Sequence, residues 1–277
     1  MNRYLRISAL AAVSAGAVIS IDACGLLTRL FPGKPPIGQV QMARVDNTTA
    51  MPDAAKEDAI VVTVTRNGGL LLGQGETHIS ELGVQLRDRV ADKPNQTMYL
   101  RADEHAQFRI VEDVIDSMRA AGTDYVGLLV RKKDEAAKKK YFACSKPPER
   151  PVGFGVVTFS SPEMRQFVPT RIPHDIWMAP KSSTEEAMPS REVSTVVVQI
   201  LYRPGGTPSY KINETDVIKA ELLPRLTEIY ANRAERVLFI LGDDDIDFAN
   251  VAEVLDIARS AEVDHIGLLT PRILRGQ

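Results

Sequence analysis

An acidic residue inside an apolar segment is the first feature of this sequence that could do chemistry. Asp22 is the one charged residue in Ile7–Leu27, a run of 21 residues. As a helix, such a run spans roughly 31 Å, enough to cross the hydrocarbon core of a bilayer. A carboxylate at that depth costs roughly 2.5 to 3.5 kcal/mol, so such groups usually pair with a partner or line an ion path. Asp22 is therefore a candidate for pairing with a partner or lining an ion path, and the alternative is a hydrated carboxylate near the outer interface.

The residues around this run predict where the chain lies. Arg3 and Arg6 precede it, and the positive-inside rule then places the N-terminus in the cytoplasm and the remaining residues outside. We expect an uncleaved, single-pass membrane anchor. A signal peptide begins in the same way, and Ile21–Cys24 is an imperfect lipoprotein cleavage box, so lipidation at Cys24 is the alternative.

Few other residues have the types and spacing that catalysis or metal binding requires. The two cysteines, Cys24 and Cys144, form no CxxC motif, which argues against a zinc site and leaves Cys144 as an expected free thiol. Asp243–Asp247 imitates a calcium loop, but Phe248 occupies the position of the turn glycine. We expect an exposed loop there, with Asp243 capping the helix that follows.

Composition and motifs also exclude broad functional classes. The chain has 34 basic and 36 acidic residues and a net charge of −2, so it lacks the basic surplus typical of nucleic-acid binding. Its four histidines are scattered, and no HExxH, GxSxG or Walker-type motif is present. The sequence therefore predicts a protein that is not an enzyme, with no cofactor, no metal and no nucleic-acid partner.

The pattern of apolar residues after the N-terminal run predicts a small α/β unit. Strand-like residues at 59–65 precede Asn67-Gly68, a strong hairpin signal, and residues 70–72 supply the returning strand. Apolar residues at helical spacing follow at 79–90 and at 108–118, and the second of these helices stops at Ala121-Gly122. Short strands are expected at 97–100 and 125–130, which gives the order ββαβαβ.

The same unit recurs 140 residues later. Residues 98–131 align with residues 238–271 without a gap, and 11 of the 34 aligned positions are identical. One of these identical pairs is Phe108 and Phe248, which we expect to be buried in equivalent places. Upstream the match is looser, with a strand at 195–202, a turn at 204–206 and a helix at 217–230 that Pro224 interrupts. The sequence thus predicts a tandem repeat.

These observations divide the chain into five parts. Residues 1–31 contain the N-terminus and membrane span, and residues 32–57, rich in proline and glycine, form a tether. Residues 58–131 are the first domain, residues 132–193 a linker, and residues 194–277 the second domain. Within the linker, a basic stretch is expected to be solvated, and only residues 153–160 have the character of a strand.

The ordered motifs of both units resemble the ExbD/TolR family of biopolymer-transport proteins. The resemblance rests on Ile60–Gly68, Tyr99–Asp103, Val111–Gly122 and Val126–Leu129 in the first unit. In the second unit it rests on the equivalent segments Phe239–Asp243, Val251–Ala261 and Ile266–Thr270. The resemblance implies a mixed α/β (α+β) fold, with one N-terminal transmembrane helix and two tandem ββαβαβ periplasmic domains.

The resemblance also implies a function. Such a protein would be an accessory subunit of an inner-membrane transducer driven by the proton motive force, with Asp22 as its proton-path carboxylate. Its partners would be a proton-channel subunit of the ExbB/TolQ type and a periplasmic protein of the TonB/TolA type. Peptidoglycan and a second copy of the chain are further candidate partners. The alternative function is a periplasmic lipoprotein or secreted module that binds cell wall or envelope proteins without proton coupling.

Overall fold

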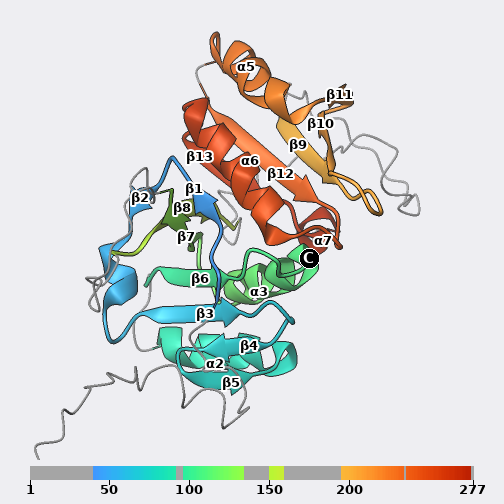
Figure 1. The fold of residues 1–277 in the computed structure, drawn as a ribbon. Helices are drawn as coiled ribbons and strands as arrows, with labels where there is room; N and C mark the ends of the chain where they lie inside the picture. The colour runs from blue at the N-terminus through green and yellow to red at the C-terminus, as the bar shows by residue number, and fades with distance from the viewer. Residues whose placement is uncertain (1–39, 92–95, 134–149, 159–194, 234, 276–277) are drawn as a thin grey trace, which may run out of the picture. The chain divides into compact units, whose positions relative to one another are not determined.

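The computed structural model describes residues 40–91, 96–133, 150–158, 195–233 and 235–275. The expected membrane span, with Asp22 and Cys24, lies outside these ranges, as does Cys144. No helix among the described residues is long and apolar enough to cross a bilayer. The described residues from Val40 onward belong to one compact unit, a mixed α/β fold with one large sheet (Figure 1).

Two halves with the same order of elements build this unit. The first half contains β3 (Ile60–Val64), β4 (Leu70–Leu72), β5 (Gly75–Thr77), α2 (Ile79–Ala91), β6 (Met98–Ala102), α3 (Phe108–Ala120) and β7 (Tyr125–Lys132). The second half contains β9 (Val196–Leu201), β10 (Ser209–Ile212), β11 (Thr215–Val217), α5 (Lys219–Tyr230), β12 (Val237–Gly242), α6 (Phe248–Ser260) and β13 (His265–Leu268). Each half thus has the expected order with one added short strand, β5 or β11, which pairs with the strand before it.

The two halves form a continuous sheet through β8 (Val152–Val157). The strand order is β11-β10-β9-β12-β13-β8-β7-β6-β3-β4-β5. β8 runs antiparallel to β7 along six residue pairs and parallel to β13 at one pair, Gly267 with Val157. The strand expected at 153–160 is therefore present, and it lies in the middle of the sheet between the two halves (Figure 1).

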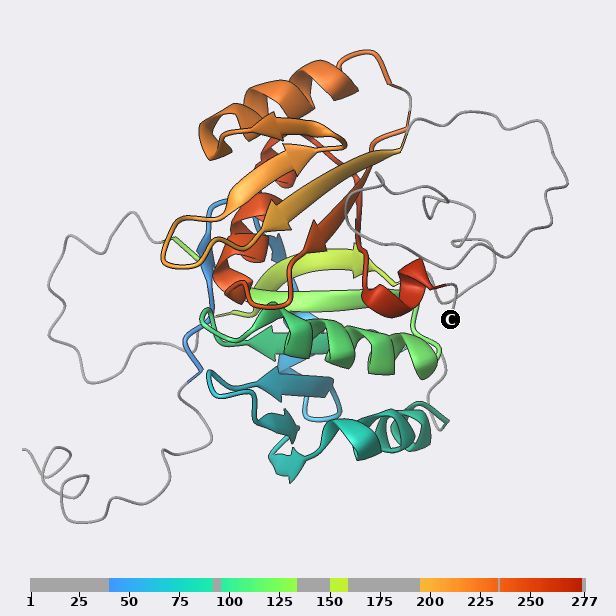
Figure 2. The ribbon, with the colours of Figure 1, turned by 90° about the vertical axis from the view of Figure 1, so that its right-hand side faces the viewer.

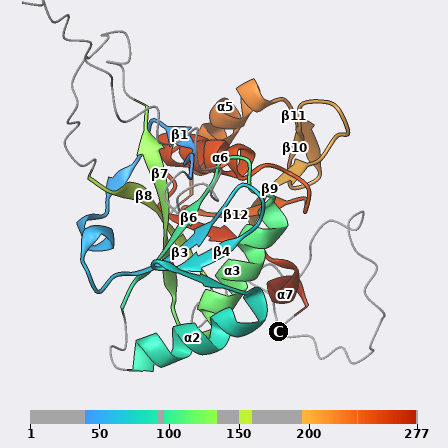
Figure 3. The same ribbon diagram turned by 60° about the horizontal axis from the view of Figure 1, so that its bottom comes forward.

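The described part of the expected tether also contacts this sheet. β1 (Arg44–Val45) pairs with β7 (Figure 3), and β2 (Thr49–Ala50) pairs with β8 (Figure 1). A short 3-10 helix, Pro52–Ala55, follows, and its buried Ala54 packs with Tyr99 and Leu129. Residues 44–55 thus differ from a free tether because β7 and β8 offer them hydrogen-bonding edges and an apolar surface.

One hydrophobic core extends through both halves. Every second residue of β3, β6, β9 and β12 belongs to it, as the two-residue period of a strand requires, and helices α2, α3, α5 and α6 contribute the other side. Phe108 and Phe248 are both fully buried in this core, as the repeat predicts. Figure 2 shows α3 and α6, which carry these residues, lying near each other at the centre of the molecule.

The first hairpin of each half explains why the two halves match less well in sequence upstream of residues 98 and 238. Val64 pairs with Leu70 in the first half, and the equivalent pair in the second half is Ile200 with Tyr210, beyond which Leu201 still pairs with Ser209. The segment between the equivalent pairs is therefore four residues longer in the second half, which breaks the alignment at this point. Gly68 has a φ of +79°, the left-handed conformation that favours glycine in a tight turn.

Helix α5 differs from its prediction because Pro224 does not interrupt it. The proline lies inside the helix and is exposed. Leu222, Leu226 and Tyr230 are buried at four-residue spacing on the opposite side. Burying three large side chains contributes more than the roughly 3 kcal/mol that an internal proline costs a helix.

Candidate functional site

The candidate functional site is the junction where α3 and α6 meet, and backbone hydrogen bonds related by the repeat hold it together. The amide of Phe108 donates to the carbonyl of Ile246 at 2.9 Å, and the amide of Phe248 donates to the carbonyl of Ala106 at 2.9 Å. Since Phe108 corresponds to Phe248 and Ala106 to Ile246, these two bonds are equivalent. The two halves therefore contact each other through the same surface.

A second pair of bonds follows the same rule. The amide of Arg109 donates to the carbonyl of Asp244 at 3.2 Å, and the amide of Ala249 donates to the carbonyl of Glu104 at 2.9 Å. An isolated antiparallel bridge joins Gln107 to Asp247 between these pairs. This arrangement is an isologous interface, the kind found between the subunits of a two-fold dimer, but it lies within one chain.

The aspartates that end β6 and β12 shape the loops at the junction. The Asp103 carboxylate accepts the amides of Gln41 at 2.9 Å and His105 at 3.0 Å, and the Asp243 carboxylate accepts the amide of Tyr202 at 2.6 Å. The expected capping role of Asp243 is therefore wrong. The N-cap of α6 is Asp247, whose side chain bonds to His105 across the junction at 3.0 Å.

A second equivalent pair, Asp116 and Asp256, binds different partners in the two halves. Asp116 on α3 accepts a hydrogen bond from the Thr270 hydroxyl at 2.7 Å, and Arg272 and Arg119 lie 3.7 and 3.5 Å from its carboxylate. Thr270 also caps α7 (Pro271–Leu274). This contact ties the C-terminal helix of the second half to α3 of the first.

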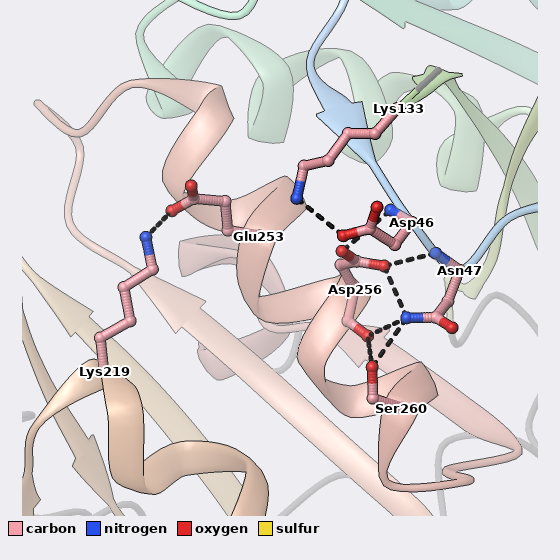
Figure 4. A network of polar contacts seen from close by, with 7 residues as sticks. All are labelled: Asp46, Asn47, Lys133, Lys219, Glu253, Asp256 and Ser260. Atoms are coloured by element: carbon pink, nitrogen blue, oxygen red, sulfur yellow. Dashed lines mark hydrogen bonds and ion pairs between the residues drawn. The ribbon is translucent and has the colours of Figure 1, made fainter. Parts of the chain in front are cut away.

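Asp256 on α6 instead binds the N-terminal segment. Its carboxylate accepts the backbone amides of Asp46 at 3.0 Å and Asn47 at 2.7 Å, and the side-chain amide of Asn47 at 3.0 Å (Figure 4). Asn47 also donates to Ser260 at 2.7 Å, and Lys133 pairs with Asp46 at 2.8 Å. Four of these contacts hold the turn between β1 and β2 on α6, and Lys133, directly after β7, adds a fifth contact to the turn.

Replacing Asp256 with Ala should release this turn. Three hydrogen bonds to a charged acceptor are lost, while water can solvate the exposed Asp46 and Asn47, so we expect the free energy of unfolding to fall by about 1 to 2 kcal/mol. Denaturant unfolding measures the loss, and hydrogen exchange at the amides of Asp46 and Asn47 should become faster. Glu253→Ala is the matched control, since Glu253 lies on the same helix in an exposed ion pair with Lys219 (Figure 4). It should cost about 0.5 kcal/mol or less, and equal losses in the two variants would contradict the prediction.

Glu112 is the one carboxylate of the junction that is buried without a partner. It lies one turn after Phe108 on α3, its side chain is 2 % exposed, and neither carboxyl oxygen has a hydrogen-bond partner. Burial, and then the charge of Asp244 and its neighbours, raises the pKa of Glu112 to about 9. Glu112 is therefore neutral at neutral pH. Its equivalent in the second half is Ala252, which is also buried.

Burial also alters Asp116, although less strongly. Desolvation raises the pKa of Asp116, and the hydrogen bond from Thr270 and the charges of Arg119 and Arg272 oppose that rise. The charged form thus has three compensating partners that Glu112 lacks. Glu112 and Asp116 lie four residues apart on one side of α3, so a paired and an unpaired carboxyl group stand next to each other at the junction.

The sequence prediction identified some of these residues and missed others. Asp22 and Cys24 lie outside the described residues, so their roles stay predictions. Within the described ranges, no group of three or more His, Cys, Asp or Glu residues is arranged to hold a metal ion. Glu112 was missed, although a signal was present: the repeat places it opposite Ala252, the one position in the first turns of α3 and α6 where a buried side chain changes from acidic to apolar.

Comparison with known proteins finds one family model that matches part of the chain. Residues 27–133 match the family model described as biopolymer transport protein ExbD/TolR. The match covers β1 to β7 and ends with the first half, and it begins after Asp22 and Cys24. No curated protein matches the chain.

Proposed function

We propose, on the premise that this chain belongs to the ExbD/TolR family through residues 27–133, that it is an accessory subunit of a proton-driven energy transducer of the inner membrane. Proteins of this family act in biopolymer transport as accessory subunits and not as enzymes. The observation that supports the proposal most directly is the family match, which spans the whole first half. It agrees with the sequence motifs at Ile60–Gly68 and Tyr99–Asp103, which contain β3 with the turn that follows it and most of β6.

In this proposal the chain has a single-pass anchor at residues 1–31, a cytoplasmic N-terminus and its bulk in the periplasm. Residues 58–131 and 194–277 are two ExbD/TolR-like domains. A channel subunit of the ExbB/TolQ type would surround the anchor, and a protein of the TonB/TolA type, with peptidoglycan as a further candidate, would contact the periplasmic part. The isologous junction supports pairing of the two domains within the chain.

Asp22 is the proposed proton-path residue. In its charged form Asp22 would be held by the helices of the partner and would accept a proton within the channel. The neutral form would lose that attraction, so protonation would change how the anchor packs. The family match starts at residue 27, so this role rests on the position of Asp22 in the apolar run Ile7–Leu27.

Two measurements on the full chain test the proposal. The first is co-purification from native membranes, where we expect a polytopic channel subunit to accompany the chain. The second is the intact mass of the membrane-extracted protein, which should correspond to an unprocessed N-terminus. A diacylated mass that Cys24→Ser abolishes would replace the proposal with the lipoprotein alternative. Recovery of the unprocessed chain without any channel subunit would also contradict it.

A further inference from the structure

The junction between the two halves contains a buried carboxyl group, that of Glu112, whose oxygens have no hydrogen-bond partner. Both oxygens of Glu112 are buried and lack hydrogen-bond partners, although Asp116 on the same side of α3 has one hydrogen bond, from Thr270, and two ion pairs. A buried polar side chain without partners is costly, and a buried charge is costlier still. The arrangement is therefore compatible with a proton on Glu112 and opposes its loss.

The surroundings of Glu112 are mostly negative. The loop before α6 faces it with Asp243 and Asp244, and Asp113 and Asp116 stand beside it on its own helix. Arg119 and Arg272 lie next to Asp116. The remaining charges of the helices packed against one another here are exposed or bound elsewhere. On α3 and α2 they are Arg109, Glu81, Arg87, Asp88 and Arg89, which are exposed. On α6 they are Glu253, paired with Lys219, Asp256, held by Asp46 and Asn47, and Arg259, which donates to backbone carbonyls.

The position of Glu112 connects this charge to the packing of the halves. One turn before it, Phe108 donates its amide to Ile246 of the second half, and its ring lies close against Gly242, where an added Cβ would come within 2.8 Å of Cδ1. Arg109, three residues before Glu112, bonds to the carbonyl of Asp244 itself. A negative charge on Glu112 would thus be repelled by the same loop that these bonds hold in place.

We propose that Glu112 is a proton-binding site that controls the junction: with its proton bound, the halves pack through α3 and α6 as observed, and loss of the proton loosens that contact. The ligand of the site is a proton, and the element that responds is the backbone pairing of residues 104–109 with 244–249. This inference does not depend on the proposed role in energy transduction, because it concerns only residues of the junction.

The sign of the pH dependence follows from the two states. In the closed junction Glu112 keeps its proton up to high pH, because its pKa is raised to about 9, whereas a solvated Glu112 in the open junction releases it near its ordinary value. Between these values the closed state binds the extra proton, so rising pH favours opening. The ratio of open to closed junction should increase up to about 10-fold per pH unit.

Hydrogen exchange of the full chain tests this, with rates corrected for the intrinsic effect of pH. In the wild type, protection of the amides of Phe108 and Phe248 should fall by up to about 10-fold per unit between about pH 6 and pH 8. Amides of the β10–β11 hairpin, at the edge of the sheet, should keep their protection. Glu112→Gln keeps the shape without an ionisable proton, so it should remove the slope, and Asp113→Asn on the same helix is the matched control that should retain it.

Three results would overturn the proposal. The first is that protection of the Phe108 and Phe248 amides in the wild type does not change with pH. The second is that Glu112→Gln shows the same pH dependence of protection as the wild type. The third is that protection of the hairpin amides depends on pH to the same extent. If Glu112→Gln does not fold, Glu112→Ala, which introduces the side chain found at the equivalent position 252, takes its place with the same expected result. Infrared spectroscopy of the wild type then gives an independent reading, since a protonated carboxyl signal at neutral pH is required and its absence would refute the proton site.

Discussion

Replacing Phe108 or Phe248 with Ala is expected to lower the free energy of unfolding by about 3 to 5 kcal/mol each, the range for removing a fully buried phenylalanine. Both rings are completely buried in the core shared by the two halves. Phe108 also fills the space against Gly242, so its removal leaves a cavity that reaches into the second half. Denaturant unfolding of the full chain measures the effect.

The control for these variants is Tyr202→Ala, which removes an aromatic ring that is 46 % exposed. We expect a change of about 0.5 kcal/mol or less there. Because one core spans both halves, the destabilised variants should also unfold in a single transition, with both halves melting together. Losses below about 1 kcal/mol in both phenylalanine variants, or separate transitions for the halves, would contradict this account of the core.

Replacing Asp22 with Asn should abolish energised function while leaving the abundance, membrane insertion and partner binding of the protein unchanged. The reason is chemical: the amide has nearly the shape of the carboxyl group but cannot exchange a proton near neutral pH. A transport or envelope-integrity assay that depends on the proton motive force measures the loss, and quantitative blotting of membrane fractions checks abundance.

Asp22→Leu separates this role from that of a hydrated surface residue. If Asp22 only lies near the outer interface, leucine should improve insertion and function should survive both substitutions. Energised activity that persists in Asp22→Asn would refute the assignment of this residue. The architecture of residues 40–275 would be unaffected by that outcome, since the contacts described at the α3–α6 junction join residues of this range.

Sequence patterns could predict the elements of each half because local rules determine them. The hairpin at Asn67-Gly68, the spacing of Phe108, Val111 and Ile115, and the match between residues 98–131 and 238–271 all reflect periodicities that survive in the structure. The positions of β4 and β10 in their hairpins also follow, apart from the four residues that the second hairpin has in addition between the equivalent pairs Val64–Leu70 and Ile200–Tyr210.

The assembly of the halves could not be predicted in the same way, because it depends on contacts between distant residues. β8 has no counterpart in the repeat, and nothing in residues 152–157 indicates that they pair with β7 on one side and β13 on the other. Asp116 and Asp256 occupy equivalent positions of the repeat, yet Asp116 accepts a hydrogen bond from Thr270 and Asp256 accepts one from Asn47. Thr270 stands opposite Val130, which has no hydroxyl group, and Asn47 lies in a segment outside the repeat.

The covalent linkage of the two halves has consequences for symmetry and for stoichiometry. In a dimer of identical chains, every mutation at the interface changes both sides. Within one chain the two sides can differ, and here Glu112 in the first half corresponds to Ala252 in the second. Pairing within one chain is also independent of protein concentration, because the linker holds each half at a high effective concentration near the other. In the proposed complex, each paired periplasmic unit would accordingly bring one Asp22 to the membrane, where two separate single-domain chains would bring two acidic anchors.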